Sequence, residues 1–488
     1  MKKERNIALA VCAVLAALIL LLTSQSSPLY PINLWGDANC LFTVGRVMKD
    51  GGVLYRDIYE QKGPLLYLIH ALAACLSDTS FWGVYIMEAL AMTVALYAAY
   101  RLMRLRAGMG FSLGAAAFFG AAFASCTAFI RGDSAEEFCL PLLMAALAIA
   151  YAEYGRRAKP MRMKRLFVCG VLAGCIATIK YTLLGAMIGL CAVEGVLALK
   201  EGGLLRALKS AGVFLGGMAV PILPWIVYFA ANGALSDAYA AYIYNNIFLY
   251  SGAAKTWANR LTEWTTLFAD NLLWTVPALL GMIALAFDRG ETGAVRLCVW
   301  AMAIGQFAAI FFAGMVWPYS PLGMAAFAVI GLMQLHRLWG KRAMSPRAKK
   351  GLTPAVCAAS LVWAYFATPN AFLRGEDIGN LAQGMFAEYV EPGKTMLQYS
   401  YLDGGVYLAT QTRPAGRFFA QLNVNLDEMN DEMDRYLREG IPDYVVVDWN
   451  RLPAEFDRYE EICALTSYDD SNRYIKSMIL YRRKNDEE

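Results

Sequence analysis

The sequence predicts an α-helical polytopic membrane protein with about eleven spans, a long first external loop with surface helices, and a small C-terminal α/β domain outside the cell membrane. The first reason is composition. Hydrophobic residues make up 58% of the 488 residues and charged residues 17%, whereas a soluble domain carries about a quarter charged residues. The second reason is a series of apolar runs, and the third is the alternation of basic and non-basic loops between them.

The apolar runs give the expected spans, because roughly 20 apolar residues cross a bilayer core of about 30 Å. These runs are 7–23, 80–100, 111–130, 138–154, 167–179, 181–199, 209–231, 268–287, 295–315, 320–336 and 353–368. The first run follows three positive charges and is similar to a signal peptide. No convincing small-residue cleavage site follows it, so we expect it to stay as the first span. Cleavage beyond residues 26–35 is the alternative.

The basic residues predict which way the chain is oriented. Of the 44 lysines and arginines, 23 lie at the N-terminus and in alternate loops, while the intervening loops hold seven. By the positive-inside rule, the basic side is cytoplasmic. The stretch 167–199 is long for one upright helix, and two short spans that meet near Lys180 keep every basic cluster inside. We therefore expect a multi-pass protein of the cytoplasmic membrane, with its N-terminus inside and its C-terminal domain outside.

The C-terminal part is polar from about Asn370 onward and is expected to fold as its own domain. Residues 426–439 have apolar positions at helical spacing. Three runs are typical of strands: 394–400, 444–447 and 474–482. Strands and helix in alternation predict a small α/β domain, which divides the chain into residues 1–368 and 369–488. The sequence has no glycine-rich nucleotide-binding motif, and we expect no nucleic-acid partner.

The first external loop is too long for a simple connection and is expected to carry the function. Leu41, Val44 and Met48 recur at helical spacing, which suits a helix lying along the membrane surface. Residues 64–76 form an apolar piece that is too short to span the membrane and should lie at the outer interface.

Four charged side chains stand out in this apolar loop: Asp37, Asp57, Glu60 and Lys62. Asp37 precedes the surface helix, where it would serve as an N-cap. It would equally serve as a general base that takes a proton from an acceptor hydroxyl. Lys62 is either an interfacial lysine that extends its ammonium to water or the cation for a phosphate leaving group.

Two further charged features belong to the predicted outer side. The turn from Arg131 to Glu137 contains Asp133 and Glu136, whose spacing fits a helix cap. Lys180 lies within an apolar stretch, where an ionisable group is costly and suggests a function. A second lysine near the outer interface, besides Lys62, would suit a lipid-anchored phosphate. The alternative is that Lys180 forms a salt bridge with a nearby acid.

The first loop resembles that of the C-type membrane glycosyltransferases, which include protein O-mannosyltransferases and lipid A aminoarabinose transferases. The similarity lies in three parts of the loop: Gly36-Asp37, Gly51-Gly-Val-Leu-Tyr-Arg-Asp57 and Tyr59-Glu-Gln-Lys62-Gly-Pro64. Arg131-Gly-Asp133 resembles the family's second acidic turn, and Trp317-Pro-Tyr-Ser-Pro321 resembles its late external turn. That late turn lacks the histidine that relatives often carry, and Ala38 follows Asp37 where many relatives have glutamate.

The resemblance implies an inverting transfer of a sugar from a polyprenyl phosphate to a glycan, lipid or protein of the cell envelope. Asp37 would be the general base. Lys62, Lys180 and Arg131 would bind the donor phosphate. Substrate contacts would come from four acids: Asp57, Glu60, Asp133 and Glu136. No cofactor is implied with certainty, and a divalent metal is left open. Membrane lipids are further partners, and the tyrosines at 239, 242, 244 and 250 would line a lipid groove or form an aromatic belt.

Two other functions compete with this hypothesis. A transporter or flippase for lipid-linked sugars would place charged residues near the bilayer midplane in two similar halves. Here the candidate acids lie in the predicted outer loops, three of them in the first, and the halves do not match. A structural or sensor protein would use the C-terminal domain as its working part, and that domain shows no catalytic set of residues.

Overall fold

The computed structural model describes residues 2–250, 256–313, 315–339, 346–399, 401–424, 426–448, 453, 456–468 and 475–484. The chain forms two compact units. The first unit comprises Met1–Ser24, Ile86–Ile226 and Gly252–Ala371, and the second comprises Gln25–Tyr85, Val227–Ser251 and Phe372–Glu488. The second unit therefore combines the first external loop with the C-terminal part of the chain and a short middle segment.

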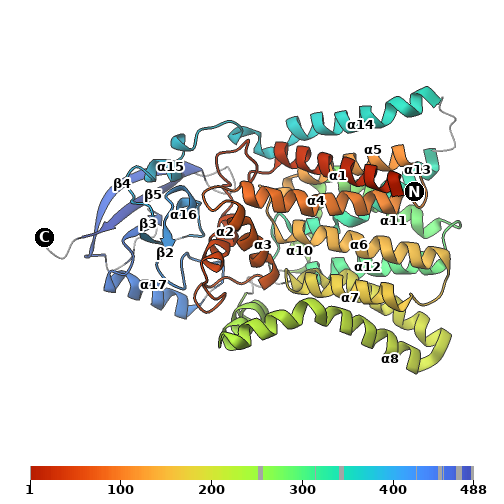
Figure 1. The fold of residues 1–488 in the computed structure, drawn as a ribbon, viewed down its shortest axis with the longest axis horizontal. Coiled ribbons are helices and arrows are strands. Elements are labelled where there is room, and N and C mark those ends of the chain that lie inside the picture. Colours follow the sequence, from red (N-terminus) through yellow and green to blue (C-terminus); the bar gives the residue numbers. More distant parts are fainter. Residues whose placement is uncertain are drawn as a thin grey trace. The chain divides into compact units, whose positions relative to one another are not determined.

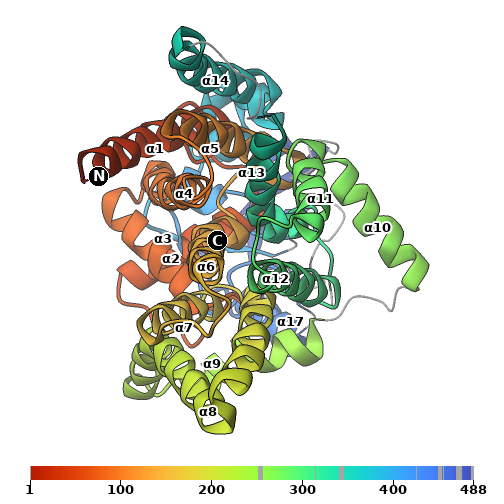
Figure 2. The same cartoon turned by 90° about the vertical axis from the view of Figure 1, so that its right-hand side faces the viewer.

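The first unit is a helical bundle. Its helices are α1 (Lys2–Thr23), most of α4 (Trp82–Met103), α5 (Met109–Ala124), α6 (Ala135–Arg156), α7 (Met163–Ala177), most of α8 (Gly185–Ala231), α10 (Trp257–Ala269), α11 (Leu272–Phe287), α12 (Gly293–Phe311), α13 (Ala328–Trp339) and α14 (Pro346–Ala367). Figure 1 shows most of these helices running side by side. In Figure 2 the bundle is seen nearly end-on, with α6 at its centre. The apolar window of α6 is 72% buried, against 39–50% for the other long apolar helices, so α6 is the central helix.

Every apolar range predicted from the sequence contains helix. Judged by length and composition, five helices in the described part of the chain can cross a membrane. A sixth candidate is the α10–α11 pair, which is bent by 106°. Small residues let some of the others pack closely: a Cβ on Gly331 of α13 would lie 1.8 Å from the Pro277 oxygen of α11. The polytopic helical fold is confirmed, while the number of about eleven spans stays a prediction.

Two interruptions in the bundle match the sequence analysis. Lys180 lies between α7 and the short 3-10 helix η2 (Tyr181–Leu184), where two short spans were predicted to meet. Helix α8 is interrupted by non-helical backbone at Gly202 and Gly203, between the two predicted runs that it covers. Glu194 crosses this interruption, because its carboxylate accepts a hydrogen bond of 3.1 Å from Ser210.

The segment before α11, which was expected to be a loop, contains helices. It contains the π-helix η3 (Tyr239–Leu249) and helix α10. Thr256 caps α10 by accepting a hydrogen bond from the Asn259 amide. The apolar positions of α10 recur at helical spacing, but the polar residues between them interrupt the hydropathy signal, so the sequence analysis missed this helix.

The C-terminal part of the second unit contains a five-stranded sheet with the order β2-β1-β3-β5-β4. Its strands are β1 (Thr395–Gln398), β2 (Arg413–Pro414), β3 (Tyr444–Asp448), β4 (Tyr459–Tyr468) and β5 (Ile475–Arg483). Strands β2, β1 and β3 are parallel, and β5 is antiparallel to both β3 and β4. Helix α17 (Asp427–Glu439) lies beside the sheet (Figure 1). The predicted α/β domain is confirmed, with β4 as a strand that the sequence analysis missed.

The loop between α1 and α4, predicted to be external, forms two packed helices, α2 (Gly36–Lys49) and α3 (Pro64–Leu76). Both were predicted, and α3 has the predicted bounds. Gly45 allows the two backbones to approach, because a Cβ there would lie 2.6 Å from the His70 carbonyl carbon. Residues Gly36–Gly45 are buried, so α2 is covered by protein on its polar face as well. Trp35 occupies the N-cap position of α2, which corrects the N-cap interpretation of Asp37.

A buried carboxylate joins α2 to the C-terminal part of the unit. The Oδ2 atom of Asp403 accepts a hydrogen bond of 2.6 Å from the Thr43 hydroxyl. Its Oδ1 atom accepts bonds from the Gln398 amide at 2.7 Å and the Gly405 N–H at 2.9 Å. Asp403 is fully buried, so these neutral donors replace its hydration.

Replacing Thr43 by valine should lower the free energy of unfolding by about 1.5–3 kcal/mol, because a buried carboxylate loses one of its donors. Thermal unfolding in detergent, followed with a thiol-reactive dye that detects buried cysteines such as Cys40, would measure this loss. Thr43→Ser keeps the hydroxyl and should cost only about 0.8 kcal/mol for the missing methyl group. Equal losses in the two variants would contradict the role given to the hydroxyl.

Candidate active site

Three of the predicted site residues meet around one ammonium group in the second unit. The Lys62 Nζ atom lies 3.4 Å from Asp37 Oδ2 and 3.3 Å from Glu60 Oε1. All three side chains are largely buried, with 16% of the Lys62 side chain exposed. Burial alone would lower the pKa of Lys62, but the carboxylates of Asp37 and Glu60 outweigh burial and raise it above its usual value. The lysine is therefore a fixed cation between two acids.

The backbone of Lys62 is held as firmly as its side chain. Its N–H donates to Glu60 Oε2 and to the Tyr67 hydroxyl, both at 3.1 Å. Its carbonyl oxygen accepts a 2.6 Å bond from the Tyr55 hydroxyl. Tyr55 has a φ of 68°, a left-handed conformation that is strained for a bulky residue and is typical of functional loops. This network fixes the position of the ammonium.

Asp57 belongs to a different part of the loop. Its carboxylate is partly exposed, pairs with Arg56 at 2.7 Å and accepts the Val53 N–H at 2.8 Å. The hydrogen bond from Arg56 lowers the pKa of Asp57. These contacts hold the turn before Tyr59, and none of the interactions described for Asp57 involves Lys62.

The predicted acidic turn lies in the first unit, at the start of α6, with its cap shifted by one residue. Ser134 is the N-cap, and its side chain accepts a bond from the Glu137 N–H. The predicted cap, Asp133, instead has a φ of 69°. Its N–H donates to Glu88 Oε1 at 2.9 Å and to Glu137 Oε2 at 3.0 Å. Serine at the N-cap with glutamate three residues later has the spacing of a capping box, although the Glu137 carboxylate here accepts the N–H of Asp133.

Lys180 forms the salt bridge that was its alternative interpretation. Its Nζ atom lies 2.6 Å from Glu136 Oε1 and 5.1 Å from the centre of the Tyr319 ring. The first unit thus brings together three features that are distant in the sequence: the acidic turn, Lys180 and the turn that contains Tyr319.

Arg131 is buried in the first unit, and its Nη1 atom donates to the Asn370 side-chain oxygen at 3.0 Å. The Asn370 amide in turn donates to the Thr23 carbonyl at 2.6 Å. Arg131 therefore helps to join the end of α1 to the segment that follows α14.

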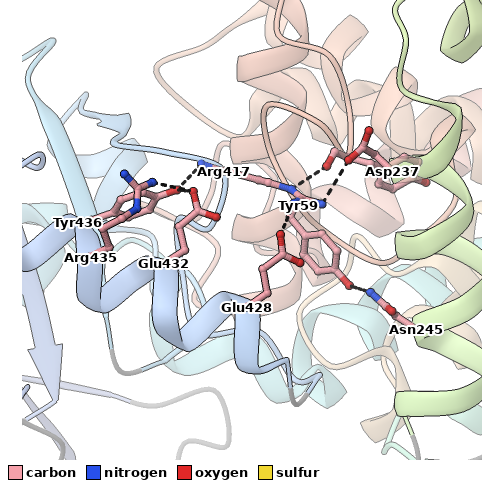
Figure 3. Close-up of polar contacts among 9 residues, drawn as sticks. Tyr59, Asp237, Asn245, Arg417, Glu428, Glu432, Arg435 and Tyr436 are labelled. Atoms are coloured by element: carbon pink, nitrogen blue, oxygen red, sulfur yellow. Dashed lines mark hydrogen bonds and ion pairs between the residues drawn. The ribbon is translucent and has the colours of Figure 1, made fainter.

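The sequence analysis missed Arg417, which lies at the centre of the contacts in Figure 3. Its Nε atom donates to the Tyr55 carbonyl at 3.0 Å, its Nη1 atom pairs with Glu428 at 2.8 Å, and its Nη2 atom lies 3.6 Å from Asp237. The guanidinium also lies 5.6 Å from the centre of the Tyr59 ring. No periodicity or motif marks this residue in the sequence.

The residues on either side of Glu60 are held by two other chain segments. The Tyr59 N–H donates to the Arg417 carbonyl at 2.9 Å. The Asn245 amide of η3 donates to the Tyr59 hydroxyl at 2.8 Å (Figure 3), and the Asn246 amide donates to the Gln61 carbonyl at 2.7 Å. Both the π-helix and the C-terminal part thus position the segment that presents Glu60 and Lys62.

The sequence analysis left open whether a divalent metal binds. The part of the chain that the structure describes contains no set of side chains arranged as metal ligands. There, no three histidine, cysteine, aspartate or glutamate side chains are grouped as metal ligands would be. Between Asp37 and Glu60 the Lys62 ammonium takes the position that a cation would need.

Comparison with solved structures supports the fold. No protein-family model and no curated protein matches the sequence. ArnT from Cupriavidus metallidurans bound to undecaprenyl phosphate is similar, with a TM-score of 0.65 and 15% identity over 97% of each chain. ArnT is a lipid A aminoarabinose transferase, and its apo structure gives a TM-score of 0.63 at 15% identity, covering 98% of this chain and 97% of that one. The chain therefore has an ArnT-like polytopic fold over nearly its whole length.

A more distant likeness is to the oligosaccharyltransferase AglB from Archaeoglobus fulgidus in complex with an inhibitory peptide and a dolichol-phosphate. Its TM-score is 0.47 at 11% identity, covering 90% of this chain and 69% of that one.

Replacing Arg417 by alanine should speed hydrogen exchange of the Tyr59 amide about tenfold. The variant loses a hydrogen bond, ion pairs and cation–π contacts that together are worth roughly 1–2 kcal/mol, and 1.4 kcal/mol corresponds to a factor of ten. Exchange measured by mass spectrometry on peptides covering residues 53–62 would test this. Arg435→Ala is the matched control, because Arg435 pairs with two acids of its own helix, Glu432 and Glu439. Similar exchange in the wild type and the Arg417 variant would contradict the positioning role.

Proposed function

We propose that this protein is an inverting glycosyltransferase that moves a monosaccharide from a polyprenyl phosphate to a cell-envelope acceptor on the outer face of the cytoplasmic membrane. The observation that carries the proposal is the Lys62 ammonium held 3.4 Å from Asp37 and 3.3 Å from Glu60 in a rigid loop. The ArnT-like fold supports it, because the ArnT structure holds undecaprenyl phosphate. That likeness is the reason for choosing a lipid-linked donor.

In the proposed reaction Asp37 acts as the general base. Its carboxylate takes the proton of an acceptor hydroxyl while the hydroxyl oxygen attacks the anomeric carbon of the sugar. The bond between that carbon and the phosphate oxygen breaks, and its electron pair stays on the phosphate. A single displacement from the opposite face inverts the configuration at the anomeric carbon.

Lys62 would respond to the charge that moves during this step. At the start its ammonium faces two carboxylates. When Asp37 takes the proton it becomes neutral, so one of the two attractions on the ammonium is lost. At the same moment the leaving phosphate gains negative charge. At an effective dielectric constant of 20, two unit charges 4 Å apart attract by about 4 kcal/mol, so the released ammonium can stabilise the phosphate.

Glu60 keeps the lysine in place while this exchange occurs. Its Oε2 atom accepts the Lys62 N–H and its Oε1 atom faces the Lys62 ammonium, so one side chain holds both ends of the residue. We assign Glu60 a positioning role for Lys62, in place of the direct substrate contact expected from the sequence.

The remaining assignments rest on the family resemblance and stay predictions. Lys180 and Arg131 would bind the donor phosphate, and Asp57, Asp133 and Glu136 would contact substrate. Because Glu136 already pairs with Lys180, a phosphate bound there would have to share the lysine with that carboxylate. Substitution of Lys180 by methionine tests its role separately from the Asp37 assignment.

Asp37→Asn should lower the rate of sugar transfer by about a hundredfold or more, because positioned general bases contribute roughly 10²–10⁴-fold. Purified protein would be incubated with labelled polyprenyl-phosphate sugars and cell-envelope acceptors, and donor consumption would be followed over time. Asp431→Asn is the control, since Asp431 is an exposed acid on α17 outside the cluster.

Unchanged transfer in the Asp37 variant would remove the catalytic assignment. If no donor is consumed and lipid-linked sugar instead crosses liposomes that contain the protein, the transporter hypothesis replaces the enzyme.

A further inference from the structure

A second polar site lies in the second unit, away from the Lys62 cluster. A cleft of about 370 Å³ opens between the last turns of α2 and the strand β2 with the turn before it. Small-molecule sites range from about 300 to 1,000 Å³, so the cleft has room for one sugar unit. Asp37 and Arg46 lie nine residues apart on α2, and a rise of about 1.5 Å per residue separates them by roughly 14 Å along the helix.

The charges that line this cleft are unevenly paired. Three cations, Arg46, Lys49 and Arg413, face two acids, Asp50 and Asp78. Both acids pair with the lysine, since Lys49 Nζ lies 2.5 Å from Asp78 and 3.5 Å from Asp50. Within the residues that the structure describes, neither arginine has an ion pair within 4 Å. The surplus positive charge of the cleft therefore resides on two guanidinium groups.

Arg46 is held in place by one hydrogen bond among the described residues. Its Nη1 atom donates to the Tyr407 carbonyl at 3.2 Å, whereas a guanidinium carries five N–H donors. Burial lowers the pKa of Arg46, and the nearby carboxylates of Asp403, Asp78 and Asp50 offset that effect only in part, so a further anion in the cleft would add to their stabilisation. The arginine is thus preorganised for an acidic ligand.

Arg413 lies on the opposite wall, on the exposed edge strand β2. Its N–H donates to the Lys394 carbonyl at 2.9 Å. The turn before it is strained: Gln411 has a φ of 53°, and the Gly393 N–H donates to its carbonyl at 2.9 Å. Strain of this kind persists only where the surrounding structure enforces it, and it is typical of binding sites. The strand and the turn therefore fix the position of the Arg413 backbone.

We infer that this cleft binds a phosphate or carboxylate group carried on a sugar. Planar guanidinium groups match the paired oxygens of both anions, and two of them face one cleft here. The anion follows from these arginines, while the choice of a sugar as its carrier rests on the proposed function. The cleft would then hold an acidic unit of the acceptor.

Direct binding tests this inference without measuring transfer. The full-length protein in detergent would be titrated calorimetrically with glucose 6-phosphate, glucuronate, inorganic phosphate and uncharged glucose. We expect the two acidic sugars to bind with millimolar or lower Kd, and glucose not to bind. Arg413→Glu should weaken their binding about tenfold or more, because charge reversal turns an attraction into a repulsion. Arg413→Lys should give an intermediate loss, since it keeps the charge without the planar fork.

Arg438→Glu is the control, because this exposed residue of α17 makes the same change in net charge outside the cleft. Thermal unfolding of each variant would show that it folds. Binding that is absent, or equal in the wild type and Arg413→Glu, would overturn the inference. Inorganic phosphate that binds as tightly as glucose 6-phosphate would overturn the sugar as carrier and support a bare anion site. Failed binding together with normal sugar transfer would overturn this inference and leave the proposed function standing. Normal binding together with failed transfer would overturn the proposed function and leave the anion site standing.

Discussion

The second unit depends on a buried ammonium shared by two carboxylates. Removing three charges from water is costly, and their mutual attraction compensates only when the groups are held in good geometry. Lys62 meets this requirement through hydrogen bonds at its N–H and its carbonyl as well as through its side chain. The left-handed conformation of Tyr55 belongs to the same constraint, because that residue provides the hydroxyl that fixes the Lys62 carbonyl. A flexible loop could not keep such a cluster together.

The geometry of this loop is determined by residues far away in the sequence. Arg417 contacts the loop at the Tyr55 carbonyl and at the Tyr59 ring. Asn245 and Asn246, on the π-helix, bond to Tyr59 and Gln61. The C-terminal part is therefore more than an appended binding module, since it supplies part of the framework around Glu60 and Lys62.

Features set by local periodicity could be predicted, whereas features set by tertiary contacts could not. Helix α3 begins at Pro64 and ends at Leu76 as expected, because proline at a first helical position and an apolar run are local signals. Grouping Asp37, Glu60 and Lys62 was also possible, since the first loop contains all three. No local signal of this kind marks Arg417 in the sequence. The cap of α6 was misplaced by one residue, because Asp133 and Ser134 are both good caps and backbone conformation decides between them.

The second unit is built from segments that are far apart in the sequence, and this has a consequence for biosynthesis. The first segment of the second unit ends at Tyr85, and β1 begins at Thr395, so roughly 310 residues must be translated in between. At about 5–20 residues per second, the loop emerges some 15–60 s before the strands that complete its fold. During this interval the apolar surface of α2 has no C-terminal residues to cover it. A chain that terminated after α14 would keep its helical bundle and still leave the segment from Gln25 to Tyr85 unfinished and prone to aggregate, so loss of the C-terminal part should be interpreted first as a failure of assembly.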